Sequence, residues 1–174
     1  MRKVEGIVLG PIVALAVSIG ITGTVATYIF LSIGTIQIWI AFIGWASFFH
    51  CGGGVDGFRK SMMGGIWGSL LALIALLAIT QIDFGIPSPL WPSMMVGFTV
   101  MVLVLGTRLD DLKVIPAAIY GYAATAGYGL VYGASISSIN SENPFFNASL
   151  SLIIGGVFGF ASEKLAKVLA FERF

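Results

Sequence analysis

Charged side chains are scarce in this chain. Of its 174 residues, 10% are Asp, Glu, Lys or Arg, whereas 57% are hydrophobic. Because a soluble domain carries about 25% charged residues, the chain lacks the polar groups needed to cover a surface that faces water. The composition therefore indicates an integral membrane protein, with the lipid bilayer as its main partner. The net charge of +1 gives no reason to expect a nucleic acid as a partner.

Cysteine and histidine occur once each, as Cys51 and His50. A lone cysteine excludes an internal disulfide, and with Asp56 as the nearest carboxylate the group falls short of the three or four ligands of a metal site. A Cys–His nucleophile pair is not expected, because adjacent helical side chains diverge by about 100°. We therefore expect no enzyme, no cofactor and no metal. His50 then lies either at the membrane interface or at the mouth of a pore.

Charge is also absent from the middle of every apolar segment. Proton- and sodium-coupled carriers normally keep a buried Asp, Glu, Lys or Arg, since such a residue is costly in the membrane and marks an ion path. The polar groups available at depth here belong to Ser, Thr, Tyr and Asn. This favours passive passage of a neutral or weakly held solute.

Six apolar segments have about the length of membrane helices. The sequence predicts them at 7–30, 36–51, 58–79, 90–105, 114–132 and 144–170. The second would extend only about 24 Å at 1.5 Å per residue, less than a hydrocarbon core of about 30 Å. The predicted fold class is an all-α membrane protein of six transmembrane helices, with one domain over residues 1–174.

The positive charges predict an orientation. With six helices, every Lys and Arg falls on one side, while the loops of the other side carry Asp83 and Glu142. Because loops rich in Lys and Arg stay cytoplasmic, both termini are expected in the cytoplasm. The residues on the basic side are Arg2, Lys3, Arg59, Lys60, Arg108, Lys113, Lys164, Lys167 and Arg173.

A glycine-rich hairpin at 42–68 organises the chain. It reads FIGWASFFHCGGGVDGFRKSMMGGIWG, with an apolar arm, three glycines, a charged patch and a second apolar arm. A weaker copy lies 53 positions on, so we predict a duplicated parallel hairpin with copies at about 36–80 and 89–133. Paired short helices ended by glycine point to a transport site, although an ordinary cytoplasmic turn explains them as well. The matched residues are Gly44, Gly53, Lys60, Ile66 and Gly68 with Gly97, Gly106, Lys113, Ile119 and Gly121.

Three sets of residues in these hairpins are candidates for a solute path. The residues of the first set would line the path and select the solute. Those of the second would break the helices, and those of the third would form a basic cytoplasmic mouth. Core packing is the alternative role for the aromatics. The sets are Trp45, Phe48, Phe49, His50, Phe98 and Tyr120; Gly52, Gly53, Gly54 and Gly106; and Arg59, Lys60, Arg108 and Lys113.

Glycines at GxxxG spacing occur in three places, at Gly6/Gly10, Gly64/Gly68 and Gly155/Gly159. Without a hydrophobic driving force between helices in lipid, close backbone approach supplies the packing. These glycines therefore predict helix interfaces, within the chain or in a homo-oligomer. Some of them would also fit a narrow solute path.

The segment 42–68, within a six-helix chain of this size, resembles the DUF1097 family of small bacterial inner-membrane proteins. The resemblance implies a multi-pass protein of the bacterial inner membrane, and it assigns no role to any residue.

These features favour a passive channel or facilitator for a small uncharged polar solute such as urea, a short amide or a neutral weak acid. One alternative is a small-anion facilitator that uses the basic mouth as an electrostatic funnel. The other is a scaffold or accessory subunit that does not transport.

Cysteine labelling tests the predicted topology. Cysteines that replace Lys3, Lys60, Lys113 or Lys167 should react only when an impermeant maleimide reaches the cytoplasm. Cysteines that replace Asp83 or Glu142 should react in intact cells. Labelling of position 60 or 113 in intact cells would overturn the six-helix arrangement.

Overall fold

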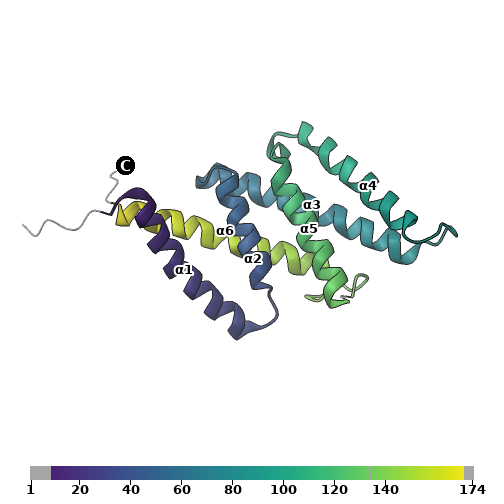
Figure 1. Ribbon diagram of the computed structural model, residues 1–174, viewed down its shortest axis with the longest axis horizontal. Coiled ribbons are helices and arrows are strands. Elements are labelled where there is room, and N and C mark those ends of the chain that lie inside the picture. Colours follow the sequence, from purple (N-terminus) through teal and green to yellow (C-terminus); the bar gives the residue numbers. More distant parts are fainter. Residues whose placement is uncertain (1–8, 134, 171–174) are drawn as a thin grey trace, which may run out of the picture.

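The computed structural model describes residues 9–133 and 135–170, and within them all regular secondary structure is helical (Figure 1). Two short 3₁₀ turns, η1 (Gly106–Arg108) and η2 (Asp110–Leu112), join α4 to α5. The predicted all-α fold is confirmed, with most helix ends within four residues of those expected. Gly6, Arg2, Lys3 and Arg173 lie outside the described residues. The helices are α1 (Pro11–Ile33), α2 (Ile38–His50), α3 (Gly54–Gln81), α4 (Leu90–Leu105), α5 (Ile115–Tyr132) and α6 (Pro144–Leu169).

Four of the described helices are long and apolar enough to cross a membrane. They are α1, α3, α6, and α4 continued through Arg108. The α2 helix has 13 residues, which extend about 20 Å. The chain is thus a helical, apolar protein of membrane type. Crossing by all six helices and the cytoplasmic placement of the termini stay predictions.

Local sequence explains where several helices begin and end. Pro11 and Pro144 stand in the first turns of α1 and α6, where a missing N–H costs nothing. The Asn143 side chain accepts a hydrogen bond from the Phe145 N–H at 2.9 Å and so caps α6. Gly34 ends α1 with a φ of 74°, a left-handed conformation that glycine adopts without strain.

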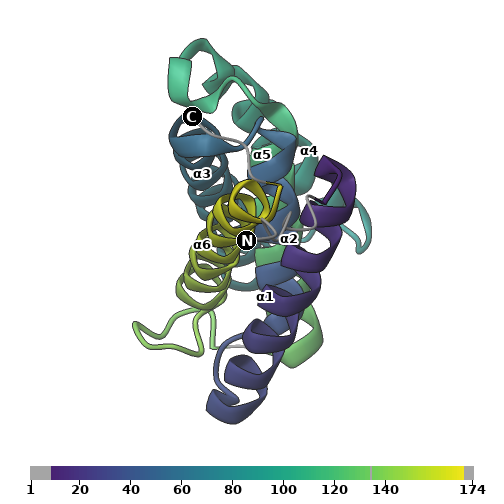
Figure 2. The same cartoon turned by 90° about the vertical axis from the view of Figure 1, so that its left-hand side faces the viewer.

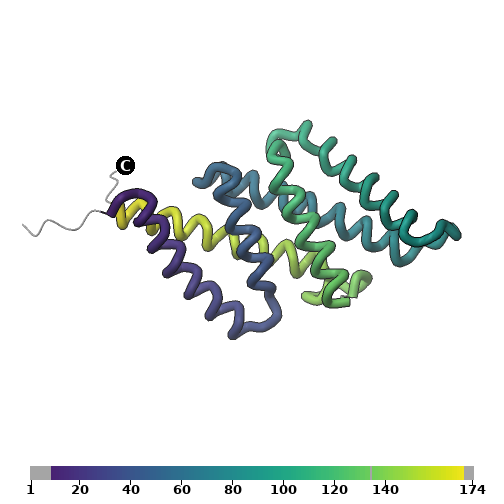
Figure 3. Tube along the Cα trace, viewed as in Figure 1, coloured from purple at the N-terminus to yellow at the C-terminus, as the bar shows by residue number. Residues whose placement is uncertain are grey.

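The six helices form two halves with matching contacts. The first half is α1–α3 and the second is α4–α6. The α1 and α2 helices of the first half pack on α6 of the second, and α4 and α5 of the second half pack on α3 of the first. The α2–α3 contact likewise has its counterpart in α5–α6. An approximate two-fold axis relates the halves, and Figure 1 is viewed roughly along it. Figure 2 shows α1 beside α6. Figure 3 shows that α2 crosses α6 in the same way as α5 crosses α3.

Burial follows the same relation. All six buried residues of α2 recur as buried residues of α5, 77 positions later. Nine of the eleven buried residues of α3 recur as buried residues of α6, 87 positions later. The α2–α5 pairs are Ile40/Ala117, Ala41/Ala118, Gly44/Gly121, Trp45/Tyr122, Ser47/Ala124 and Phe48/Thr125.

The two halves run in opposite directions. Successive helices alternate in direction. The α1 helix therefore begins at the end of the bundle that carries Arg59, Lys60, Lys113 and Lys167, which we call the basic end. The α4 helix begins at the opposite end, which carries the Asp83 and Glu142 loops (Figure 1). In a membrane the two-fold axis would then lie in the membrane plane, as in transporters with inverted repeats.

Glycines hold the two crossings together. An ideal Cβ on Gly44 would lie 2.2 Å from the Leu152 carbonyl oxygen, and one on Gly155 would lie 1.8 Å from that of Ala41. At the other crossing, a Cβ on Gly68 would lie 1.8 Å from the Ala118 oxygen. Gly121 stands in the same relation to the Gly65 oxygen, at 1.9 Å. The backbones therefore touch at both crossings, as predicted for small residues between helices in lipid.

The predicted parallel hairpin repeat is not confirmed by this packing. Gly44 is pressed against α6, whereas nothing lies within 4 Å of a Cβ on Gly97. Gly53 has a φ of +70°, and Gly106 has a φ of −60°. The sequence match at a spacing of 53 residues aligned these turn glycines only because the chain is rich in glycine. The relation seen in space instead joins 11–81 with 90–169.

Glycine substitutions test the crossings. Gly44→Ala and Gly121→Ala should each destabilise the protein in detergent by about 1–3 kcal/mol, because the added methyl forces the backbones apart. Gly20→Ala and Gly97→Ala are matched controls with open space around the new methyl. Thermal unfolding midpoints measure the effect, and equal midpoints in all four variants would refute the crossings.

Candidate functional site

The predicted aromatic residues of α2 pack against α6. Trp45 is 5% exposed, its indole N–H donates to Ser162 Oγ at 3.1 Å, and its ring stacks on Phe158 with centroids 6.1 Å apart. Phe48 is fully buried, and its ring would touch a Cβ on Gly159. Phe49 is half-buried against Phe48, with centroids 5.1 Å apart. These contacts make Trp45 and Phe48 part of the α2–α6 interface.

The other three predicted residues lie elsewhere. His50 Nδ1 lies 3.0 Å from the Tyr120 hydroxyl, so this pair joins the end of α2 to α5 at the basic end. Phe98 is 55% exposed on α4. The structure therefore brings His50 and Tyr120 together but does not gather all six residues around one passage. A role for them in selectivity stays a prediction.

The three glycines between α2 and α3 form a turn with an acidic partner. Gly52, Gly53 and Gly54 have φ values of 95°, 70° and 63°, which favour glycine. The Gly54 N–H donates to Glu163 Oε2 of α6 at 2.7 Å, and Lys167 pairs with the same carboxylate at 2.6 Å. The Glu163 side chain is only 16% exposed. Glu163 was not among the predicted site residues, because nothing in the sequence spacing places residue 163 beside residue 54.

Gly106, the fourth predicted helix-breaking glycine, follows the last residue of α4 and lies against the indole ring of Trp67. Its ideal Cβ would lie 2.6 Å from Trp67 Nε1. The Trp67 N–H donates to the Leu103 carbonyl oxygen at 3.2 Å. Glycine at 106 thus lets Trp67 of α3 cover the last turn of α4.

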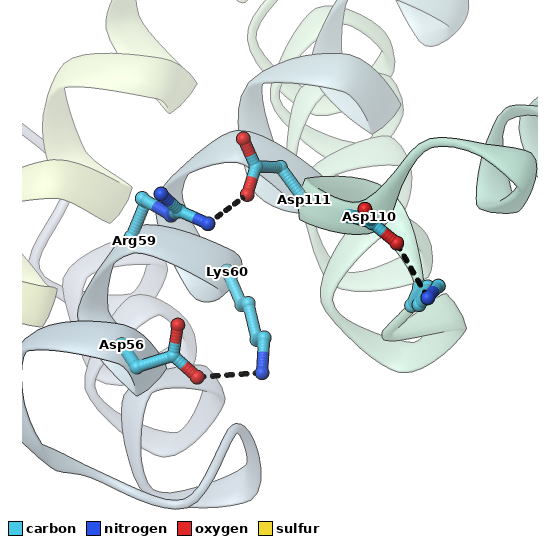
Figure 4. Close-up of polar contacts among 6 residues, drawn as sticks. Asp56, Arg59, Lys60, Asp110 and Asp111 are labelled. Atoms are coloured by element: carbon cyan, nitrogen blue, oxygen red, sulfur yellow. Dashed lines mark hydrogen bonds and ion pairs between the residues drawn. The ribbon is translucent and has the colours of Figure 1, made fainter.

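The predicted basic mouth is largely neutralised by carboxylates (Figure 4). Arg59 reaches from α3 to Asp111 of η2 at 2.5 Å. Lys60 pairs with Asp56 at 2.6 Å, and Lys113 pairs with Asp110 at 2.5 Å. The hydrogen bond from Lys113 lowers the pKa of Asp110 and raises that of Lys113, so both stay charged at neutral pH. Arg108 is exposed.

A cavity of about 480 Å³ opens between α3, α4 and α5 at the end opposite the basic end. Its volume falls in the range of small-molecule sites, roughly 300–1,000 Å³. The wall is mainly apolar, and Tyr122 and Thr80 supply its side-chain hydroxyls. Other lining residues include Ala75, Val96, Ala126 and Gly129.

Tyr122, one of the residues that line this cavity, carries a hydroxyl that can accept a hydrogen bond. Its hydroxyl lies 2.9 Å from Thr99 Oγ1, and both residues are buried. Thr99 Oγ1 also lies 2.8 Å from the Met95 carbonyl oxygen, which can only accept, so the Thr99 proton is directed there. The Tyr122 O–H then donates to Thr99, and the lone pairs of the Tyr122 oxygen are left to accept from a solute N–H or O–H. The sequence predicts both hydroxyls at depth in the membrane, but nothing in their spacing indicates that they pair.

Within the described ranges, no group of three or more His, Cys, Asp or Glu side chains is arranged to hold a metal ion. A comparison with protein families finds a match for most of the chain. The model of the DUF1097 family, described as a protein of unknown function, matches residues 16–167. No curated protein and no solved structure matches the chain. The predicted resemblance is confirmed, and the chain belongs to the DUF1097 family.

Proposed function

We propose that the protein is a passive facilitator for a small uncharged polar solute in the bacterial inner membrane. The observation that carries this proposal is the cavity of about 480 Å³, whose lining residues with polar side chains are Tyr122 and Thr80. An apolar cavity with a few directed polar groups is the usual form of a small-molecule site. A solute with N–H donors, such as urea or a short amide, fits the free lone pairs of Tyr122.

The distribution of charge supports a neutral, uncoupled solute. In the described residues, the charged side chains of helices are confined to the first two turns of α3 and the last two turns of α6. The helix residues around Tyr122 and Thr99 carry no carboxylate or amine. None of the described residues that line the cavity therefore carries a charge that could exchange a coupling proton or bind a sodium ion.

The alternative of an anion facilitator has less support. An electrostatic funnel needs uncompensated positive charge, and three of the four basic residues at the predicted mouth pair with a carboxylate. A homo-oligomer remains part of our proposal, since α4 has only 11% of its apolar window buried and offers a long face to lipid or to a second copy. A non-transporting scaffold would use the same face.

Solute flux in proteoliposomes tests the proposal. Urea or acetamide should permeate faster than in protein-free vesicles, and Tyr122→Phe should lower the rate by about tenfold, the effect of losing about 1.4 kcal/mol of hydrogen bonding to the solute. Tyr28→Phe is the matched control, because Tyr28 is 75% exposed on α1. Stopped-flow light scattering measures these rates.

The same vesicles test the passive mode. Flux should follow the solute gradient alone and should not respond to a proton ionophore, a sodium gradient or a membrane potential. His50→Gln should change the rate modestly and leave this dependence intact. Accumulation of a neutral solute against its gradient would contradict passive transport. Loss of that accumulation in His50→Gln would make His50 a coupling residue.

A further inference from the structure

Another cavity, of about 350 Å³, lies at the end of the bundle opposite the basic end. It opens between the last turn of α5 and the loop that leads to α6. Its volume suits a small-molecule site, and polar groups make up most of its wall. The lining residues are Tyr128, Tyr132, Gly133, Ser135 and Glu142.

Two tyrosines of α5 form one side of this cavity. Residues four apart lie on the same face of a helix, and the Tyr128 and Tyr132 rings have centroids 5.1 Å apart, with planes tilted by 32°. Tyr128 is 8% exposed and belongs to a core cluster with Ile40 and Ala148, whereas Tyr132 is 55% exposed. The core thus holds one ring in place, and the second ring extends the aromatic wall toward the water.

The loop that carries Glu142 is held by the side chains of two asparagines. The Asn143 amide, in a residue that is 4% exposed, donates to the carbonyl oxygens of Ile136 and Ser138 at 2.8 and 2.9 Å. The Glu142 N–H donates to Asn140 Oδ1 at 3.0 Å. These bonds hold the Glu142 backbone beside the end of α5 and leave its carboxylate unused.

Glu142 differs in this respect from the other described carboxylates. Within residues 9–133 and 135–170, no group of the protein forms an ion pair or a hydrogen bond with the Glu142 carboxylate. All described Lys and Arg residues lie at the basic end, so the chain offers Glu142 no cation. The others are Asp56, Asp110, Asp111 and Glu163, which form ion pairs, and Asp83, which accepts from the Gly85 N–H.

We propose that this cavity is a binding site for a small organic ammonium ion, such as a methylated amine. The Glu142 carboxylate supplies the opposite charge, and the Tyr128 and Tyr132 rings supply cation–π contacts to the methyl groups. A Ca²⁺ ion takes about six to eight oxygen ligands, whereas this wall supplies a single carboxylate. The orientation predicted from the positive charges places the site outside the cytoplasm.

Saturation-transfer difference NMR on the purified full chain in a nonionic detergent tests this inference. The probe is tetramethylammonium, whose methyl protons report binding, and its dissociation constant follows from a titration at constant ionic strength. The neutral control is tert-butanol, which carries methyl groups but no charge. Tetramethylammonium should give a saturable signal, and tert-butanol should not.

Substitutions then locate the bound cation. Glu142→Gln should raise the dissociation constant about fivefold, the effect of losing an exposed ion pair. Asp83→Asn, which removes an equal charge at the same end, is the matched control and should leave it unchanged. Tyr132→Leu should raise it roughly twofold to fivefold, and Tyr132→Phe should not, because phenylalanine keeps the aromatic face.

The outcomes are independent of solute flux. No saturable signal in the parent protein, or equal dissociation constants in the parent and Glu142→Gln proteins, would overturn the ammonium site even where urea flux is intact. Saturable binding of tert-butanol as tight as that of tetramethylammonium would also overturn it. Where Tyr132→Leu fails to fold, the comparison of Glu142→Gln with Asp83→Asn decides. Loss of tetramethylammonium binding in Glu142→Gln alone supports the site, whether or not urea or acetamide permeates.

Discussion

Contact between helix backbones is the constraint on which this structure depends. In lipid, apolar side chains gain nothing by meeting one another instead of the bilayer, so helices associate through close packing. The chain meets this need at two crossings, α2 with α6 and α3 with α5, where Gly44, Gly155, Gly68 and Gly121 each face a carbonyl of the partner helix. The peripheral helices α1 and α4 then cover α6 and α3.

The crossings also determine where solute space can exist. The α4 helix packs along α3 but has little contact with α5, and the cavity opens between them. It therefore lies beside an outer helix rather than at a crossing, where the backbones touch.

Much of the fold was predictable because length, apolarity and turn residues act locally. The helix positions and the packing role of the glycines follow from these features alone. The two-fold relation was not predictable, because related positions share burial rather than chemistry. Trp45 corresponds to Tyr122 and Phe48 to Thr125, and only the crossing glycines recur as glycine. The 53-position comparison instead matched Gly53 with Gly106, which adopt different backbone conformations.

The candidate site was predictable only in its chemistry. The absence of charge at depth indicated a neutral solute, and Thr99 and Tyr122 were among the polar groups available. Their pairing across α4 and α5 depends on tertiary packing. So does the hydrogen bond between Gly54 and Glu163, which lie 109 positions apart in the sequence. Among the aromatic residues predicted to select the solute, Trp45 and Phe48 pack in the α2–α6 crossing, and their role in selectivity stays a prediction.

Solute protection of a cavity thiol tests the central claim most directly. A reporter cysteine, Ala126→Cys, is placed in the wall of the cavity between α3, α4 and α5 on a Cys51→Ser background, and its reaction with a maleimide is followed with and without acetamide. A solute site in the cavity predicts a labelling rate that falls as acetamide is added. An equal rate at all acetamide concentrations, with rapid acetamide flux through the same protein, would place the solute elsewhere and contradict the account.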